Sequence, residues 1–534
     1  MSESAAEAVP EADAQPSTGG RGVLSHREIM TVLAGLMLGM LLAALDMTIM
    51  ASATKTIADQ LHGQTMQAWV TTGYLITATI STPLYGKLSD IFGRKPMYLT
   101  AISLFLAGSV LSGVANSMYE LAAFRAVQGL GAGGLMSLAL AIIADMVSPR
   151  ERSRYQGYFM AIWGVSSVLG PVVGGFFAGA GTFAGIDGWR WVFLVNVPIG
   201  IVALVVVAKF LNVPHTKVRH RVDYWGAIAL TVALVPLLIV AEQGRTWGWG
   251  SGTALSMYAI GVVGIAAFIY VERRMGDEAL LPLRLFKRGV FSLTNVVNFI
   301  MGIGMFGMMM SLPLYLQIVK GASPTESGLL TLPMTAGILV ASMGSGILIS
   351  KTGRYKRYPV AGLGIVSASM FLFAQIGVDT PLWQSMAIMT LAGVGLGLCM
   401  QTLILAIQND VPAKDMGVAT SSATFFRSIG GTVGTAVFLS ILFTVTLSNL
   451  PVVAGGGGFD LDDTSFLNTL SPEQARPILD AFSTGIDTVF TVGGIVVAIA
   501  FALIWFLKEV PLSDKSGIQR IDDEAAAAAP AAVH

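Results

Sequence analysis

A single carboxylate, Asp46, lies inside the apolar stretch 41–50 (LLAALDMTIM). A carboxylate in hydrocarbon is costly, and such residues usually pair with a cation or carry out a function. Burial favours the neutral carboxyl and a nearby cation favours the charged one, so a carboxyl under both influences can bind and release a proton near neutral pH. Arg125, a basic residue inside another apolar segment, is the expected cation. Asp46 and Arg125 therefore predict a proton-coupling site. The alternative is a structural aspartate, hydrogen-bonded to Thr48 or to a neighbouring helix.

The composition indicates that the elements carrying these residues cross a membrane. Of 534 residues, 54% are hydrophobic and 12% are charged, and the mean hydropathy is +0.70. A soluble protein has about 25% charged residues. The net charge of zero gives no reason to expect nucleic acid as a partner. The single cysteine, Cys399, excludes an intrachain disulfide.

Fourteen segments are long and apolar enough to cross a bilayer as helices. They are 29–51, 68–86, 96–115, 119–146, 155–180, 190–211, 224–242, 253–272, 290–318, 325–350, 358–377, 382–409, 416–446 and 485–508. Most lysines and arginines fall in alternate loops, which predicts that these loops and both termini are cytosolic. The fold class is therefore an all-α integral membrane protein.

Two halves of the chain resemble each other. The stretch 86–94 (GKLSDIFGR) resembles 346–354 (GILISKTGR), and a set of glycines recurs at the same offset. These are Gly157, Gly170 and Gly174, repeated as Gly417, Gly430 and Gly434. Two parallel halves around a central axis are typical of transporters that alternate between two states, with a site near the bilayer midplane.

The repeat predicts the domain organisation. We expect disordered cytosolic tails at both ends, two six-helix bundles, and an inserted pair of helices between them. A long, Gly-rich outer loop at 447–484 belongs to the second bundle. The boundaries are 1–27 for the first tail, 28–211 for the first bundle, 212–289 for the insert, 290–510 for the second bundle and 511–534 for the last tail.

The stretch 86–95 (GKLSDIFGRK) resembles the signature loop of the major facilitator superfamily. In that family the aspartate and arginine of this loop latch the two halves together on the cytosolic side. The resemblance implies a cytosolic latch made of Gly86, Asp90, Gly93 and Arg94, with Asp145 as the acidic partner of Arg94. The second copy has Ser350 in place of the aspartate, so we expect a different arrangement there.

Three further stretches resemble motifs of the drug:proton antiporters in this superfamily. The stretch 124–136 (FRAVQGLGAGGLM) resembles the span-four motif, which contains Arg125 and Gln128; the alternative is an arginine that reaches the outer headgroups. The stretch 44–61 resembles the first-span motif of the fourteen-span branch around Asp46, and departs from it at 53–56. The stretch 425–434 (FFRSIGGTVG) resembles an arginine-containing pattern of that branch and singles out Arg427.

The stretch 164–175 (GVSSVLGPVVGG) resembles the antiporter motif of span five. Its glycines and proline can bend a helix and allow close packing, and packing alone is the alternative interpretation. The residues of this motif are Gly170, Pro171, Gly174 and Gly175.

The family pattern places the substrate cavity between the two bundles. The expected lining residues are Gln128, Asn295, Asn298, Met301 and Met305. Methionine is flexible and polarisable, which suits varied apolar substrates; the alternative is methionine that faces lipid or packs between helices.

The resemblance implies a major-facilitator-type fold of fourteen helices in a bacterial plasma membrane, exporting lipophilic, drug-like amphiphiles in exchange for protons. The sequence has no metal-ligand spacing, phosphate-binding loop or nucleophile motif, so we expect neither an enzyme nor a cofactor, and the proton gradient is the expected energy source. Two alternatives remain: export of an endogenous lipid or secondary metabolite by the same coupling, and a non-transporting receptor or scaffold.

Overall fold

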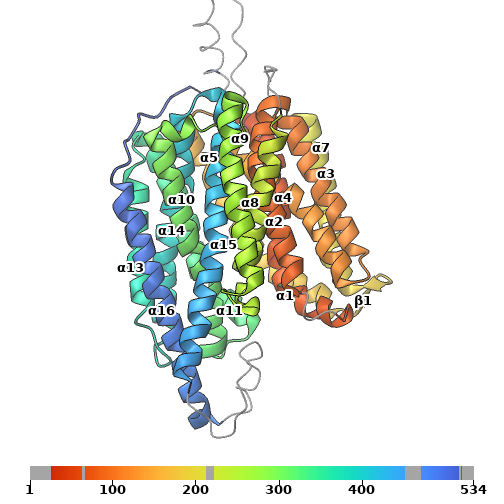
Figure 1. Ribbon diagram of the computed structural model, residues 1–534, viewed down its shortest axis with the longest axis vertical. Coiled ribbons are helices and arrows are strands. Elements are labelled where there is room, and N and C mark those ends of the chain that lie inside the picture. Colours follow the sequence, from red (N-terminus) through yellow and green to blue (C-terminus); the bar gives the residue numbers. More distant parts are fainter. Residues whose placement is uncertain (1–25, 63–66, 212–221, 451–470, 516–518, 520–534) are drawn as a thin grey trace, which may run out of the picture.

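The computed structural model describes residues 26–62, 67–211, 222–450, 471–515 and 519 (Figure 1). Apart from one short hairpin, the regular structure in this part of the chain is helical, which confirms the predicted fold class. Residues 1–25 of the predicted tail 1–27 lie outside the described residues, and its last two residues begin α1. Most of the last tail and 451–470 of the predicted outer loop also lie outside the described residues.

The first bundle contains the helices that come before the insert. They are α1 (His26–Gln60), α2 (Gln67–Phe92), α3 (Arg94–Gly113), α4 (Met118–Met146), α5 (Pro149–Gly179), α6 (Trp191–Leu194) and α7 (Asn196–Phe210). A two-stranded antiparallel hairpin, β1 (Thr182–Phe183) and β2 (Ile186–Asp187), follows α5. The hairpin was not expected from the sequence, and the two residues between its strands, Ala184 and Gly185, adopt the positive φ angles that a tight two-residue turn requires.

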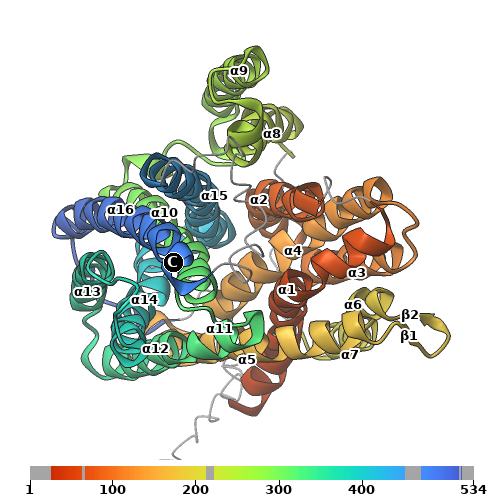
Figure 2. The ribbon, with the colours of Figure 1, turned by 90° about the horizontal axis from the view of Figure 1, so that it is seen from below.

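The insert consists of α8 (Tyr224–Trp247) and α9 (Gly252–Met275). These two helices pack against each other, and α8 also contacts α2 and α15. Figure 2 shows the pair outside the two bundles, beside the junction of α2 and α15.

The second bundle contains the remaining helices. They are α10 (Gly289–Leu314) with a π-helical continuation at Tyr315–Val319, α11 (Pro324–Leu330), α12 (Leu332–Thr352), α13 (Arg357–Phe373), α14 (Leu382–Asp410), α15 (Met416–Asn449) and α16 (Pro472–Ile504). The two bundles meet along two seams, α2 against α15 and α5 against α12 (Figure 2).

Twelve helices in the described part of the chain are long and apolar enough to cross a membrane. The predicted spans 68–86 and 358–377 also form helices, α2 and α13, but these are not among the twelve. Helix α13 is apolar, but its 17 residues make it shorter than the twelve helices. The count of fourteen spans therefore stays a prediction.

The start of α16 and the first residues of the last tail differ from expectation. Helix α16 begins at Pro472, where Ser471 and Gln474 form a capping box, so 472–484 of the predicted loop is helical. A polar segment looks like a loop in a hydropathy profile, and only the capping residues indicate the earlier start. Residues 511–515 lie against the second bundle, because Asn409 bonds the main chain of Pro511 and Ser513.

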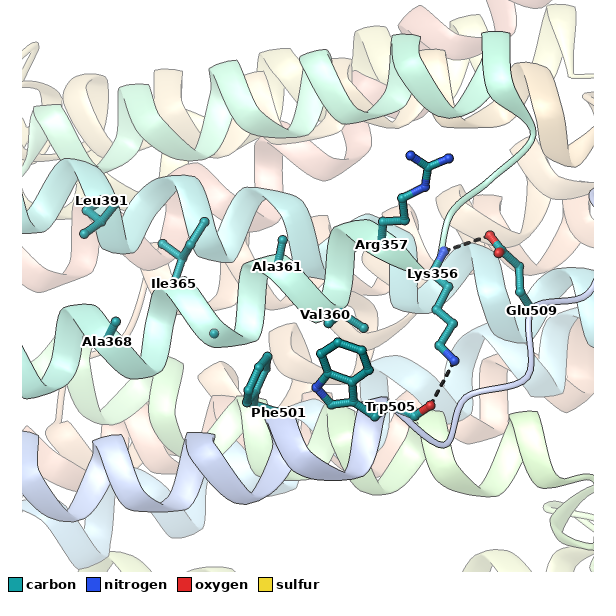
Figure 3. A pocket seen from close by; sticks show the side chains of 11 residues that line it. Lys356, Arg357, Val360, Ala361, Ile365, Ala368, Leu391, Phe501, Trp505 and Glu509 are labelled. Atoms are coloured by element: carbon teal, nitrogen blue, oxygen red, sulfur yellow. Dashed lines mark hydrogen bonds between the residues drawn. The ribbon is translucent and has the colours of Figure 1, made fainter.

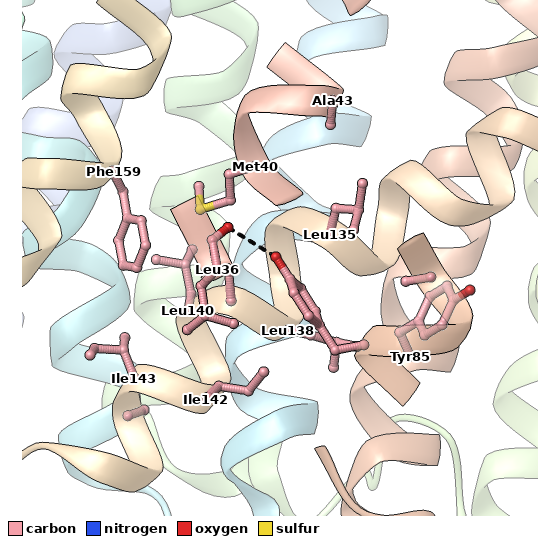
Figure 4. Packing of buried hydrophobic residues seen from close by; sticks show 14 of the residues in the cluster. Leu36, Met40, Ala43, Tyr85, Leu135, Leu138, Leu140, Ile142, Ile143 and Phe159 are labelled. Atoms are coloured by element: carbon pink, nitrogen blue, oxygen red, sulfur yellow. Dashed lines mark hydrogen bonds between the residues drawn. The ribbon is translucent and has the colours of Figure 1, made fainter. Parts of the chain in front are cut away.

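Hydrophobic packing makes a core in each bundle. Figure 4 shows part of the first, in which Leu36 and Met40 of α1 lie among residues of α4 such as Leu138 and Leu140. This core continues into the second bundle through Ile404 and other residues at one end of the molecule. The bundles are thus packed together tightly at that end, which also contains Asp90.

Candidate functional site

Asp46 is fully buried and forms an ion pair with Arg125. Its Oδ2 accepts a hydrogen bond from Nη1 of Arg125 at 2.5 Å, and the two side chains are 0% and 2% exposed. Its Oδ1 accepts hydrogen bonds from Gln128 at 2.8 Å and from Asn196 at 3.1 Å. Both carboxylate oxygens therefore have donors, and no water reaches the group in this state.

The donors around Asp46 are themselves fixed by a second set of contacts. Ser109 accepts hydrogen bonds from Gln128 and Asn196 and donates to the main-chain oxygen of Phe193. Nη1 of Arg125 also donates to Oε1 of Gln128 at 2.8 Å. The guanidinium lies 4.2 Å from the centre of the Tyr74 ring, a cation–π arrangement that favours its charge.

These side chains come from α1, α3, α4 and α7, all in the first bundle. The sequence pointed to Asp46 and Arg125 here, assigned Gln128 to the substrate cavity, and missed Ser109 and Asn196. A lone asparagine in the apolar run 191–207 was the available signal for Asn196. No feature distinguished Ser109 from the other serines of the apolar helices.

Close helix packing supports the network. At Gly108 an added Cβ would lie 2.4 Å from the main-chain nitrogen of Gln128, so α3 and α4 touch through their backbones. A Cβ added at Gly170 would lie 2.1 Å from Oγ1 of Thr48. Thr48 donates to the main-chain oxygens of Ala44, Leu45 and Ser166, and none of its hydrogen bonds goes to Asp46. The antiporter motif therefore places α5 against the turn of α1 that carries Asp46.

The residues of the predicted latch lie together at the end of the molecule that contains Asp90, called here the Asp90 end. Arg94 pairs with Asp145 at 2.7 Å and with Asp90 at 2.6 Å, and the three side chains are nearly buried. Gly93, just before α3, has a φ of 97°, a conformation that favours glycine. The structure thus brings Asp90, Arg94 and Asp145 into one cluster.

Asp90 also binds the second bundle. Its two oxygens accept hydrogen bonds from the main-chain N–H groups of Gly417 and Val418, at 3.2 and 3.1 Å. These groups lie in the first turn of α15, where free N–H groups and the helix dipole favour an anion. An added Cβ on Gly86 would lie 2.8 Å from the main-chain oxygen of Gly417, so the backbones meet directly at this point.

Other hydrogen bonds between the bundles gather at the same end. Arg152, which is fully buried, donates to Gln408 at 2.7 Å. Arg150 donates to the main-chain oxygen of Ser350, in the second copy of the repeat, at 2.8 Å. The sequence did not indicate the contact between Arg152 and Gln408, because 256 positions separate the two residues.

The predicted cavity residues of the second bundle are buried. Met301 and Met305 lie in the core of that bundle. Asn295 donates to the main-chain oxygen of Phe291, one turn earlier in its own helix. Asn298 is 0% exposed and none of its polar side-chain atoms has a partner among the described residues.

Several other polar side chains of the second bundle also have buried atoms without a hydrogen-bond partner among the described residues. Oε1 of Gln401, Nη1 of Arg427 and Oδ1 of Asp487 are buried atoms without a hydrogen-bond partner in the part of the chain that the structure describes. Asp487 is a half-buried acid in α16 that the sequence analysis did not single out. Both bundles contain such atoms, and in the first bundle they include Nε of Arg125 and Oδ1 of Asn196, although both oxygens of Asp46 have donors.

A separate apolar groove of about 660 Å³ lies between α13, α14 and α16. Figure 3 shows Phe501 and Trp505 along it, with Lys356 and Glu509 at one end. Its lining residues all come from the second bundle or the segment after α16. The groove therefore does not correspond to the predicted cavity between the bundles.

The family model described as Major Facilitator Superfamily matches residues 36–435. The chain belongs to the major facilitator superfamily. Multidrug transporter protein MdtP of Bacillus subtilis is 34% identical over 539 residues, covering 95% of this chain and 98% of that protein. A tetracycline resistance determinant of Streptomyces rimosus is 40% identical over 318 residues, covering 54% and 92%. The solved structure of the proton:xylose symporter XylE aligns with a TM-score of 0.63 at 16% identity, over 93% of this chain and 99% of that one, and supports the fold.

The contact between Gly170 and Thr48 predicts the effect of a single methyl group in this major facilitator protein. Gly170→Ala places a Cβ 2.1 Å from Thr48 Oγ1 and 2.9 Å from the Thr48 main chain, so α5 must move away from α1. We expect a loss of stability of about 1–3 kcal/mol and a lower rate of ethidium transport in membrane vesicles.

Gly175→Ala is the matched control for Gly170→Ala, because nothing lies within 4 Å of the Cβ it adds. Thermal unfolding in detergent and transport should match those of the wild type. Equal behaviour of the two variants would contradict the packing role given to Gly170.

The environment of Asp90 predicts a pH-dependent closure of the Asp90 end. Burial raises the pKa of Asp90 to about 6; the charge of Arg94 opposes this shift and that of Asp145 adds to it. Opening exposes Asp90 and returns its pKa toward the ordinary value, so the closed state binds a proton more tightly than the open state. We therefore expect the closed population to increase as the pH falls toward 6, and the part of this dependence that is due to Asp90 to be lost in Asp90→Asn, so that the dependence is weaker than in the wild type.

Spin labels on Phe92→Cys and Lys414→Cys, in a Cys399→Ser background, would report the distance across this end. Both positions are exposed, and Cys399 is buried. The same pH dependence in the wild type and in Asp90→Asn would exclude Asp90 as the responsible group.

Proposed function

We propose that this protein is a secondary active transporter that exports lipophilic, drug-like compounds in exchange for protons. The observation that carries the proposal is the buried ion pair of Asp46 and Arg125, because an intramembrane carboxylate bound to a guanidinium is costly to build and typical of proton pathways. The names of two relatives, a multidrug transporter and a tetracycline resistance determinant, support this class of substrate.

Protonation of Asp46 would change the contacts within the first bundle. Three side chains donate hydrogen bonds to its carboxylate, from Arg125, Gln128 and Asn196. A neutral carboxyl has a weaker attraction for the guanidinium, and one of its oxygens becomes a donor that faces other donors. Arg125 is then free to strengthen its contact with Oε1 of Gln128, and α1 can shift relative to α4 and α7.

Asp46 is shielded from water in this state, so proton exchange requires another state of the transporter. The Asp90 end is closed by contacts of Asp90 and Arg152 with the second bundle. We propose that opening of one end admits protons to Asp46, and that substrate and proton bind in alternation. One charge crossing 100 mV provides about 2.3 kcal/mol, which is enough to bias such a cycle.

The substrate would contact polar atoms that lack partners in this state. Asn298, Gln401 and Arg427 offer such atoms on three different helices of the second bundle. Asn298 and Gln401 are uncharged amides, so an amphiphilic compound matches them better than a phosphate does.

We propose that the protein lies in the plasma membrane of a bacterium, with both termini and the Asp90 end on the cytosolic side. Most of the lysines and arginines outside the spans belong to loops at that side, which follows the positive-inside rule.

Asp46→Asn tests the proposal, because it removes the charge and the proton site but keeps an oxygen that can accept hydrogen bonds. We expect it to fold and to reduce pH-gradient-driven transport of ethidium and tetracycline in inverted vesicles to the level of vesicles without the protein. In cells, a protonophore should raise ethidium accumulation with the wild type and have little effect with the variant.

Asp187→Asn is the control, since Asp187 is an exposed carboxylate in the hairpin. It should transport as the wild type does. Transport by Asp46→Asn at the wild-type rate under the same pH gradient would refute the role of Asp46.

A further inference from the structure

The two inserted helices carry a pair of buried carboxyl groups that the proposed transport cycle does not use. Asp223 caps the start of α8, where its Oδ1 accepts a hydrogen bond from the N–H of Gly226 at 2.7 Å. Glu272 lies in the last turn of α9, and its Oε2 accepts from the N–H of Leu281 at 2.9 Å. The two residues are 3% and 1% exposed.

The other oxygen of each carboxyl group has no donor. Oδ2 of Asp223 and Oε1 of Glu272 are buried without a hydrogen-bond partner among the described residues. They lie on the same side of Gly226, at 2.3 and 3.0 Å from the point that a Cβ on that residue would occupy. The two unpaired oxygens therefore lie beside the same residue of α8, and the N–H of Leu280 is a further backbone group that interacts with Glu272.

Two carboxylates this close and this buried cannot both be charged without a large cost, and a proton shared between them removes that cost. One proton also gives each unpaired oxygen a partner. We propose that Asp223 and Glu272 form a proton-binding site, in which a single proton is shared between Oδ2 of Asp223 and Oε1 of Glu272.

Among the described residues, Lys87 on α2 is a cation close enough to interact electrostatically with Glu272. Its ammonium group donates to the main-chain oxygen of Asp277 at 2.9 Å rather than to either carboxyl. The other charged groups around Lys87 are Asp90, Arg284 and Asp415. Lys87 thus moderates the charge of the pair but does not supply the missing donor.

The carboxyl pair is linked to the Asp90 end through the segment 276–288. Glu272 holds this segment at Leu281, and Arg284 within it binds both Asp277 and Asp415. Asp415 directly precedes α15, whose first N–H groups bind Asp90. The protonation state of the pair therefore acts on the segment that fastens the insert to the closed end.

Loss of the shared proton leaves two facing carboxylates and loosens this attachment. Because the folded protein binds the proton more tightly than the unfolded chain, the free energy of unfolding decreases as the pH rises past the point where the proton leaves. The inserted helices then make the stability of the closed end depend on cytosolic pH.

Infrared difference spectra of the purified protein, recorded between mildly acidic and alkaline pH, test the shared proton directly. The wild type should lose a C=O stretching band of a neutral carboxyl as the pH rises. The band should be absent in Glu272→Gln and in Asp223→Asn, because in each variant the new amide donates to the remaining carboxylate. Glu278→Gln, a change of the same kind in the same segment, should keep the band.

Thermal unfolding over the same pH range provides a second measurement. The unfolding temperature should fall with rising pH in the wild type and in Glu278→Gln, and this part of the dependence should be lost in both pair variants. If the wild type lacks the band, or if both pair variants keep it, the shared proton is excluded. Neither measurement involves transport, so a failure of drug export would leave this result unaffected.

Discussion

The cost of placing a charged carboxylate inside an apolar bundle is the constraint on which the first half of this protein depends. Asp46 is tolerated because Arg125, Gln128 and Asn196 all donate to it. Removal of one partner from a buried ion pair costs about 3–5 kcal/mol, so α1, α4 and α7 are bound to one another through this carboxylate. Gly108 and Gly170 allow the helix approaches that bring the donors within reach.

Under the role proposed for Asp46, binding or loss of one proton changes contacts across the whole bundle. The network joins four helices, and α5 contacts both Thr48 of α1 and residues of α12 in the second bundle. A shift of α1 is therefore transmitted to a seam between the bundles. At the Asp90 end, the contact of Asp90 with α15 belongs to the other seam, between α2 and α15, and the segment 276–288 connects this seam to the inserted helices.

Much of this architecture was predictable from the sequence, because apolar length sets helix positions and the repeat indicates two bundles. Most of the predicted spans form helices close to their predicted positions, although 190–211 is divided into α6 and α7 and 325–350 into α11 and α12. The pairing of Arg94 with Asp145 follows from a local motif and one neighbouring helix. Contacts between distant segments were not predictable. Asn196, Gln408 and Glu272 are ordinary polar residues in their own helices, and only the packing of helices far apart in the chain gives them partners.

The central claim is that Asp46 binds the coupling proton and that substrate displaces it. Proton release on addition of ethidium to the purified protein, followed with a pH indicator in weakly buffered detergent solution, measures this most directly. We expect the wild type to release protons and Asp46→Asn, which still binds ethidium, to release none. Equal proton release by the two proteins would contradict this claim.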